Sequence, residues 1–283
     1  MFGVNRQVYY RKIQTVKRRK SRAVKVIELV ESIRLQMPKL GTRKLYFMLE
    51  NELKQLKVGR DMLFRILKAN HMLIVPKRRY HITTNSHHRF RKHQNQLLDL
   101  QIQHPEQVWV SDITYIGKRD KPCYLSLVTD AYSKKIVGFN VADNLNTESS
   151  LAALKKALKQ RKDALLPLIH HSDRGLQYCA NEYQNLLKKS NIKCSMTQNS
   201  DPYENAVAER INGILKQEFG IDKFHNELSI TKLLVKNAIE IYNQKRPHYS
   251  NFLLTPNQMH QQNKIKMRTY KTKNSYKNVL ATV

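Results

Sequence analysis

Three acidic residues occupy positions where a carboxylate could take part in chemistry. Asp112 lies in the strand-like run WVSDITYI, where burying a charge is costly unless it meets a metal or another partner. Asp173 lies where a strand opens into the turn SDRG, and Glu209 lies inside a helical stretch. Three converging carboxylates suit Mg²⁺ or Mn²⁺, which prefer oxygen ligands, and two such ions would clamp the attacking and leaving oxygens of a phosphoryl transfer.

The predicted helix over residues 204–219 favours Glu209 as the third carboxylate. At about 100° per residue, Lys216 falls on nearly the same side of the helix as Glu209, and the apolar side chains fall opposite. Glu218 falls over the apolar side and Glu204 precedes the helix, so neither is a good third ligand. We therefore expect Glu209 and Lys216 to face a cleft together.

Each acid also has a plain structural explanation when it is taken alone. Asp112 could pair with Arg174, Asp173 could be a turn residue or a helix cap, and Glu209 could be a surface charge. Three accidental positions are less expected than one, but spacing alone does not exclude them.

The charge of the chain indicates a polyanionic partner. The 283 residues include 51 Lys and Arg against 22 Asp and Glu, a net charge of +29. Residues 1–100 hold 24 basic and 6 acidic residues, residues 261–283 hold 6 basic residues and no acid, and the stretch between them is nearly balanced. Cationic segments around a compact region that carries functional acids fit contacts to nucleic-acid phosphates.

Residues 1–75 predict a small basic helical domain. Helices are expected over residues 21–37, 42–53 and 58–73. The first is expected to bury the face that carries Val24, Ile27, Val30 or Glu31, and Leu35 at helical spacing. The third would leave three cations outward, Arg60, Arg65 and Lys68, as in a helix-turn-helix unit whose third helix enters a DNA major groove. Any small basic bundle gives a similar pattern, and residues 76–100 indicate a basic linker.

Residues 101–260 predict one α/β domain. Strands are expected over residues 108–116, 123–133, 135–142 and 192–197, with another that closes in the turn of the stretch 165–175. Helices are expected over residues 147–161, 181–190, 204–219 and 227–244. This order, βββαβαβα, is typical of a ribonuclease-H-like fold with a five-stranded mixed sheet and flanking helices. Residues 261–283 form a basic C-terminal tail.

Cysteine usage and hydropathy narrow the class of protein. Cys123, Cys179 and Cys194 form no C-x-x-C pair, so neither a disulfide framework nor a zinc module is expected. No apolar run is long enough to span a membrane, and no secretory signal is present. We expect a cytoplasmic protein in a reducing compartment, without a membrane partner.

Three runs, WVSDITYI, HHSDRGLQY and NAVAERINGILKQE, resemble the integrase-type core of the IS-three group of bacterial insertion-sequence transposases. The 35 residues between Asp173 and Glu209 and the Lys seven positions after Glu209 match that group. The likeness continues into YNQKRPHYSNFLLTP and reaches upstream through LGTRKLYFMLE to FGVNRQVYY, similar to the start of the B-frame protein. One departure is NSDPYEN at 199–205, which lacks the Gly that many members carry there.

The resemblance implies a DDE transposase. Asp112, Asp173 and Glu209 would be its catalytic metal ligands for Mg²⁺ or Mn²⁺, and Lys216 would contact DNA near them. Such an enzyme hydrolyses a strand at an element end, and the freed 3′-hydroxyl attacks a second phosphodiester. Further DNA contacts are expected at Arg210 and Arg246. The family also implies an A-frame partner protein, fused or separate, and a homo-oligomer on DNA.

Two other functions remain open from the sequence. A non-catalytic DNA-binding regulator of the element would explain the basic segments, although it has no need for three acids near phosphates. A ribonuclease-H-type nuclease would share the fold and the metals. The cationic first hundred residues and the acid spacing favour the transposase.

Overall fold

The structure of the protein is a computed structural model that describes residues 5–75, 94–97, 100–117, 122–197, 205–223 and 227–262. The chain divides into two compact units, Met1–Arg79 and Tyr80–Val283. Each unit is described by itself. Most of the expected linker, the loop around residues 198–204 and nearly all of the expected basic tail lie outside the described residues.

The first unit is helical, as expected. Its helices are α1 (Arg6–Arg34), α2 (Thr42–Met48), α3 (Glu50–Gln55) and α4 (Arg60–Ala69). The expected second helix is divided at Leu49, which separates α2 from α3. Helix α4 buries its apolar side chains Leu63, Ile66 and Leu67. The cations expected to point outward, Arg60, Arg65 and Lys68, are exposed.

Helix α1 is longer than the predicted helix, and the side chains that it buries differ from the predicted ones. It begins at Arg6, well before residue 21. Residues 6–20 are mostly good helix formers, so they extend the helix although they bury no face. The buried side chains are Val26 and Val30, four residues apart, whereas Val24 and Leu35 are 53% and 86% exposed. The expectation that Val24 and Leu35 belong to the buried face is therefore wrong.

The second unit is built on a five-stranded mixed sheet, which confirms the expected architecture. The strands are β1 (Val108–Gly117), β2 (Pro122–Asp130), β3 (Ile136–Ala142), β4 (Leu168–Ser172) and β5 (Ile192–Met196). They lie in the order β3-β2-β1-β4-β5. The first three strands pair antiparallel, and β1, β4 and β5 pair parallel.

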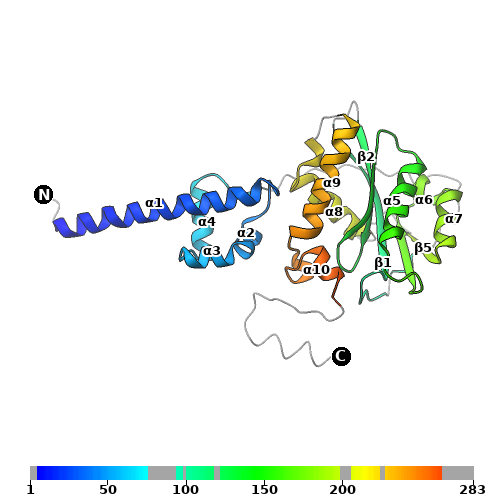
Figure 1. The fold of residues 1–283 in the computed structure, drawn as a ribbon, viewed down its shortest axis with the longest axis horizontal. Helices are drawn as coiled ribbons and strands as arrows, with labels where there is room; N and C mark the ends of the chain where they lie inside the picture. The colour runs from blue at the N-terminus through cyan, green and yellow to red at the C-terminus, as the bar shows by residue number, and fades with distance from the viewer. Residues whose placement is uncertain are drawn as a thin grey trace, which may run out of the picture. The chain divides into compact units, whose positions relative to one another are not determined.

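Helices cover both faces of this sheet (Figure 1). On one face lie α5 (Thr147–Gln160), α6 (Leu176–Cys179) and α7 (Asn181–Lys189). On the other lie α8 (Ala206–Gln217) and α9 (Leu228–Lys245), followed by α10 (Pro256–His260) and joined by short 3-10 turns at Ile221–Lys223 and Tyr249–Asn251. Gly138 in β3 allows α5 to approach closely, since a Cβ there would lie 2.1 Å from the Ala153 carbonyl oxygen.

The second unit begins before residue 101. The Gln96 amide donates a hydrogen bond to the Ser195 hydroxyl at 2.9 Å. Leu97 and Leu100 pack against the buried cluster that includes Val108. The expected linker therefore ends earlier than residue 100, because its last apolar residues cover one face of the sheet.

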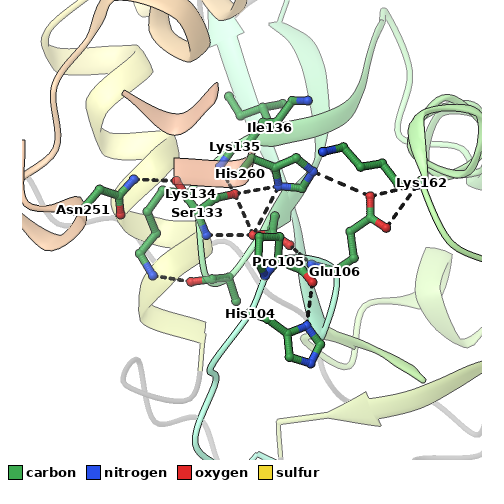
Figure 2. A network of polar contacts seen from close by, with 12 residues as sticks. His104, Pro105, Glu106, Ser133, Lys134, Lys135, Ile136, Lys162, Asn251 and His260 are labelled. Carbon is green, nitrogen blue, oxygen red and sulfur yellow. Dashed lines mark hydrogen bonds and ion pairs between the residues drawn. The ribbon is translucent and has the colours of Figure 1, made fainter. Parts of the chain in front are cut away.

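A buried polar network joins the C-terminal helix to the sheet (Figure 2). The Asp130 carboxylate accepts hydrogen bonds from the Glu106 amide at 2.7 Å and from the Ser133 amide and hydroxyl at 2.7 and 2.6 Å. The His260 ring lies 3.0 Å from the Ser133 hydroxyl and 3.6 Å from the Glu106 carboxylate. Burial alone would raise the pKa of Asp130, but the hydrogen bonds and charge of His260 and the bonds from Ser133 outweigh it and lower that pKa.

Candidate active site

Strand β1 presents Asp112 to the face of the sheet that carries α8. Side chains alternate along a strand, and in β1 Trp109 and Ile113 pack into the core beneath α5–α7 while Val108 and Val110 pack toward α8. By this alternation the Asp112 side chain lies on the same face as Val108 and Val110. Its Oδ2 accepts a hydrogen bond from the Asn212 side chain of α8 at 2.6 Å, and its Oδ1 accepts one from the Ile113 amide at 2.9 Å.

Asp173 is brought beside Asp112 by the parallel pairing of β4 with β1. The register pairs Ser111 with Ser172, so the next residue of each strand is an aspartate at the same level of the sheet. Neighbouring strands are about 4.8 Å apart. The Asp173 Oδ1 also accepts a hydrogen bond from the Gly175 amide at 3.1 Å, which holds the carboxylate at the start of the turn.

A polar stripe on α8 faces this part of β1. It consists of Asn205, Glu209, Asn212 and Lys216, whose spacing of four, three and four residues places them on one side of a helix. At one end the Asn205 side chain donates to the Ser111 carbonyl at 3.1 Å. At the other the Lys216 ammonium lies 4.4 Å from the centre of the Tyr115 ring. Glu209 lies between these two points of attachment.

The electrostatics show that the acids influence one another. Burial raises the pKa of Asp112 to about 7, the Asp173 carboxylate adds to the rise, and Glu209 adds a smaller part. Hydrogen bonds from Asn212 and Ile113 oppose it. Burial also raises the pKa of Glu209 and lowers that of Lys216, although the charge of Asp112 favours the charged form of Lys216.

Next to Asp112, on the opposite face of the sheet, Ser111 belongs to a buried polar cluster with His170 and Tyr183. The His170 Nε2 lies 2.7 Å from the Ser111 hydroxyl and 2.9 Å from the Tyr183 hydroxyl. Burial lowers the pKa of His170 to about 3, so the ring is neutral at physiological pH. These contacts fix β1 and β4 against each other directly below the two aspartates.

The donor set fits a hard divalent cation, although the side chains are not gathered around one. Within the described ranges, no three His, Cys, Asp or Glu side chains form a group that could hold a metal ion as they stand. The Asp173 carboxylate raises the cost of ionising Asp112, and an oxygen-seeking cation between them would remove that cost. Glu209 is exposed on its helix and is the most open of the three.

Two contributors to the site were missed by the sequence prediction. Asn205 and Asn212 hold α8 against β1, one through a carbonyl and one through the Asp112 carboxylate. The signal was present in the sequence, since both lie on the Glu209–Lys216 side of the helix. The alternative in which Asp112 pairs with Arg174 is not among the contacts of Asp112 that the structure describes.

The expected DNA contacts separate into surface and buried cations. Arg210 is exposed on α8, next to Glu209. Arg246, in contrast, is 1% exposed, and its guanidinium makes two hydrogen bonds to the Glu218 carboxylate at 2.7 and 2.8 Å. A direct contact of Arg246 with DNA does not fit this position, because the guanidinium is already neutralised within the unit. Glu218 is accordingly engaged away from the acids, as its place on the helix predicted.

No disulfide joins the three cysteines, all of which lie in the described part of the chain. Across the described residues, no helix is both long enough and apolar enough to cross a membrane.

Comparison with protein families identifies the class. A family model described as "Integrase core domain" matches residues 102–202, and a second model with the same description matches residues 190–256. Together they cover β1 to α9, including all three acids. The mixed sheet and α8 thus belong to an integrase core domain.

Comparison with individual proteins narrows the class to a family. The chain is 33% identical over 255 residues to the "Insertion element IS600 uncharacterized 31 kDa protein" of Shigella sonnei, covering 88% of this chain and 92% of that protein. It is 34% identical over 160 residues to "Transposase InsF for insertion sequence IS3fB" of Escherichia coli K12, covering 56% and 55% of the two chains. The chain belongs to the insertion-element transposases with an integrase core.

Among solved structures, the fold is similar to a chain of the simian T-cell lymphotropic virus intasome. The two are 16% identical with a TM-score of 0.50, covering 82% of this chain and 79% of that one. The catalytic core domain of HTLV-2 integrase, solved in complex with magnesium, is 20% identical with a TM-score of 0.44 and covers 56% of this chain and 97% of that domain.

Proposed function

We propose that this transposase cuts DNA at the ends of its insertion element and joins the freed 3′-hydroxyl to a second DNA, with Asp112, Asp173 and Glu209 as the catalytic carboxylates. The observation that supports this most strongly is the position of two aspartates at one level of adjacent parallel strands, with the Glu209 helix attached to the same strand. A DNA-binding regulator has no use for this arrangement, and no observation favours a ribonuclease.

Each residue of the proposed site has a separate task. Asp112 and Asp173 are held by hydrogen bonds from their own strands and from α8, so their oxygens are oriented before a substrate arrives. Glu209, on an exposed helical position, supplies the third carboxylate. Two Mg²⁺ or Mn²⁺ ions bound by these residues would supply activation of the attacking oxygen and stabilisation of the leaving oxygen. Lys216, attracted by Asp112, is positioned to meet a phosphate.

The proposed DNA contacts come from both units. Arg60, Arg65 and Lys68 form an exposed basic face on α4, suited to phosphates or to base edges in a major groove. In the second unit Arg210 and Lys216 lie beside the acids. Because two element ends have to be joined in one reaction, we include a homo-oligomer on DNA and an A-frame partner protein in the proposal.

Strand transfer with labelled DNA tests this function. The purified chain, with Mg²⁺ or Mn²⁺, is incubated with a duplex that ends in a candidate element terminus and with a target duplex. Glu209→Gln keeps the size of the side chain and removes its charge, and it is expected to abolish joined products, by a factor of about 10³ or more. Glu182→Gln, the same change at an exposed position of α7, is the matched control.

The outcomes distinguish the readings. Joined strands from the wild-type and Glu182→Gln proteins but not from Glu209→Gln support the proposal. Equal joining by all three proteins excludes Glu209 from the reaction. DNA binding without joining is followed by the same assay on a fusion with the A-frame product, and continued absence of joining in the fusion contradicts the proposed activity.

A further inference from the structure

The first half of α1 is a helix without a partner in the described chain. From Arg6 to Ser21 every side chain is exposed except Ile13, which is half-buried. Figure 1 shows this half of α1 extending beyond the helices α2–α4 of its own unit. Among its exposed residues are large apolar side chains, including Tyr9 at 59% and Val16 at 44%. A helical segment of this length is marginal in water unless one of its faces is packed.

The apolar residues of α1 follow a heptad pattern. Spacings of four and three residues alternate along the helix from Tyr9 to Val30, through the positions Tyr9, Ile13, Val16, Lys20, Ala23, Ile27 and Val30. We call this row the α1 seam. Its last part is packed within the first unit, where Val30 is buried and Ile27 half-buried. Its first part has the same pattern, with one Lys in the row, and faces solvent.

Three of the four positions that flank the exposed part of the α1 seam are cationic. In a heptad they correspond to the e and g positions, which choose the partner of a coiled coil through charge. Here they are Tyr10, Lys12, Lys17 and Arg19, and residues 6–27 contain no Asp or Glu. Two copies of α1 would therefore place Lys and Arg against Lys and Arg, which disfavours self-association.

We infer that the exposed part of the α1 seam is a docking surface for an acidic amphipathic helix of another protein. An apolar row bordered by cations is complementary to an apolar row bordered by Asp or Glu. Duplex DNA would satisfy the cations but leave Tyr9, Ile13 and Val16 without apolar contacts. This inference does not depend on the catalytic proposal, since it concerns the first unit alone.

The test measures binding of a designed peptide to the full chain by fluorescence anisotropy. The probe is a labelled synthetic helix with Leu at its a and d positions and Glu at e and g, and its control is a scrambled peptide of the same composition without the heptad pattern. Ile13→Glu with Val16→Glu disrupts the α1 seam. Gln14→Glu with Thr15→Glu adds the same charge at neighbouring exposed positions outside the row. Circular dichroism verifies that both variants keep their helix content.

We expect the heptad peptide to bind about tenfold or more tightly than the scrambled peptide, and the seam variant to lose that advantage while the control variant keeps it. Four results would overturn the inference. Equal binding of both peptides, or equal losses in both variants, would show that charge alone acts. A seam-dependent dimer of the chain by sedimentation would assign the surface to self-association. Loss of duplex DNA binding, without any change in peptide binding, in the seam variant would assign it to DNA.

Discussion

A substitution of Arg246 can distinguish a structural role from a role in DNA binding. The sequence predicted Arg246 as a DNA contact, whereas the structure buries its guanidinium in an ion pair with Glu218. The guanidinium makes two hydrogen bonds to Glu218 and a third, at 2.8 Å, to the His248 ring. Arg246→Met keeps the apolar stem and removes these bonds together with a longer one, at 3.4 Å, to the Pro247 carbonyl. Breaking a buried pair typically costs about 3–5 kcal/mol because the remaining charge is left uncompensated. For a unit of this size that corresponds to a fall in Tm of about 6–20 °C.

The assay combines thermal unfolding, followed by circular dichroism, with DNA binding measured well below the transition. Arg210→Met is the matched control, because Arg210 is an exposed cation beside Glu209. We expect Arg246→Met to lower Tm and to leave the salt dependence of DNA binding unchanged. Arg210→Met should leave Tm nearly unchanged and reduce the salt slope by about one phosphate contact. An unchanged Tm together with a reduced salt slope in Arg246→Met would refute the structural role of this pair.

Three further predictions follow from packing, charge and orientation. Gly138→Ala should destabilise the second unit by about 1–3 kcal/mol or more, measured by urea unfolding, because the added methyl meets the backbone of α5. The pKa of Asp130 is lowered in the folded protein, so its ionised carboxylate contributes stability above the unfolded pKa of about 3.9. This stability is lost as pH falls below that value. The dependence of folding stability on acid pH, followed by fluorescence, should therefore be flatter for Asp130→Asn than for the wild type. Asn212→Ala removes the hydrogen bond that orients the Asp112 carboxylate, so magnesium-dependent strand transfer should weaken about 10–100-fold. Part of the activity should return at higher magnesium concentration. Wild-type activity in Asn212→Leu, which has no hydrogen-bond donor, would contradict a hydrogen-bonding role.

Periodicity predicted most of the second unit because its elements are amphipathic or strongly apolar. All five strands and the helices α5, α7, α8 and α9 lie where the pattern placed them, within a few residues. Helix α10 was missed although Thr255 and Gln258 form a capping box with Pro256 at the first helical position, a local signal that was available. The predicted helix over residues 21–37 is shorter than α1, because apolar residues are dense only in the second half of α1.

The sequence proposed the acids of the candidate site but not the residues that support them. Asp112 and Asp173 could be placed because a carboxylate in a strand-like run and one at a strand end are unusual positions. Arg246 was predicted as a DNA contact because residue type gives charge but not burial, and only the fold reveals that Glu218 lies opposite it. Asn205 and Asn212 were overlooked although they share the helical spacing of Glu209 and Lys216, because attention was given to charged residues and an amide shows its role only through its partners.

The polar network around Asp130 has a consequence for how the chain is made. The Ser133 hydroxyl and the His260 ring are separated by 127 residues in sequence, and Asn251 donates to the Ser133 carbonyl at 2.6 Å from 118 residues away. Synthesis proceeds from the N-terminus, so the β2–β3 hairpin emerges from the ribosome long before these partners. Until residue 260 has been translated, Asp130 lacks the histidine that packs beside it. The sheet should therefore complete its folding late, and nascent chains arrested before α10 should remain protease-sensitive while the first unit is already folded.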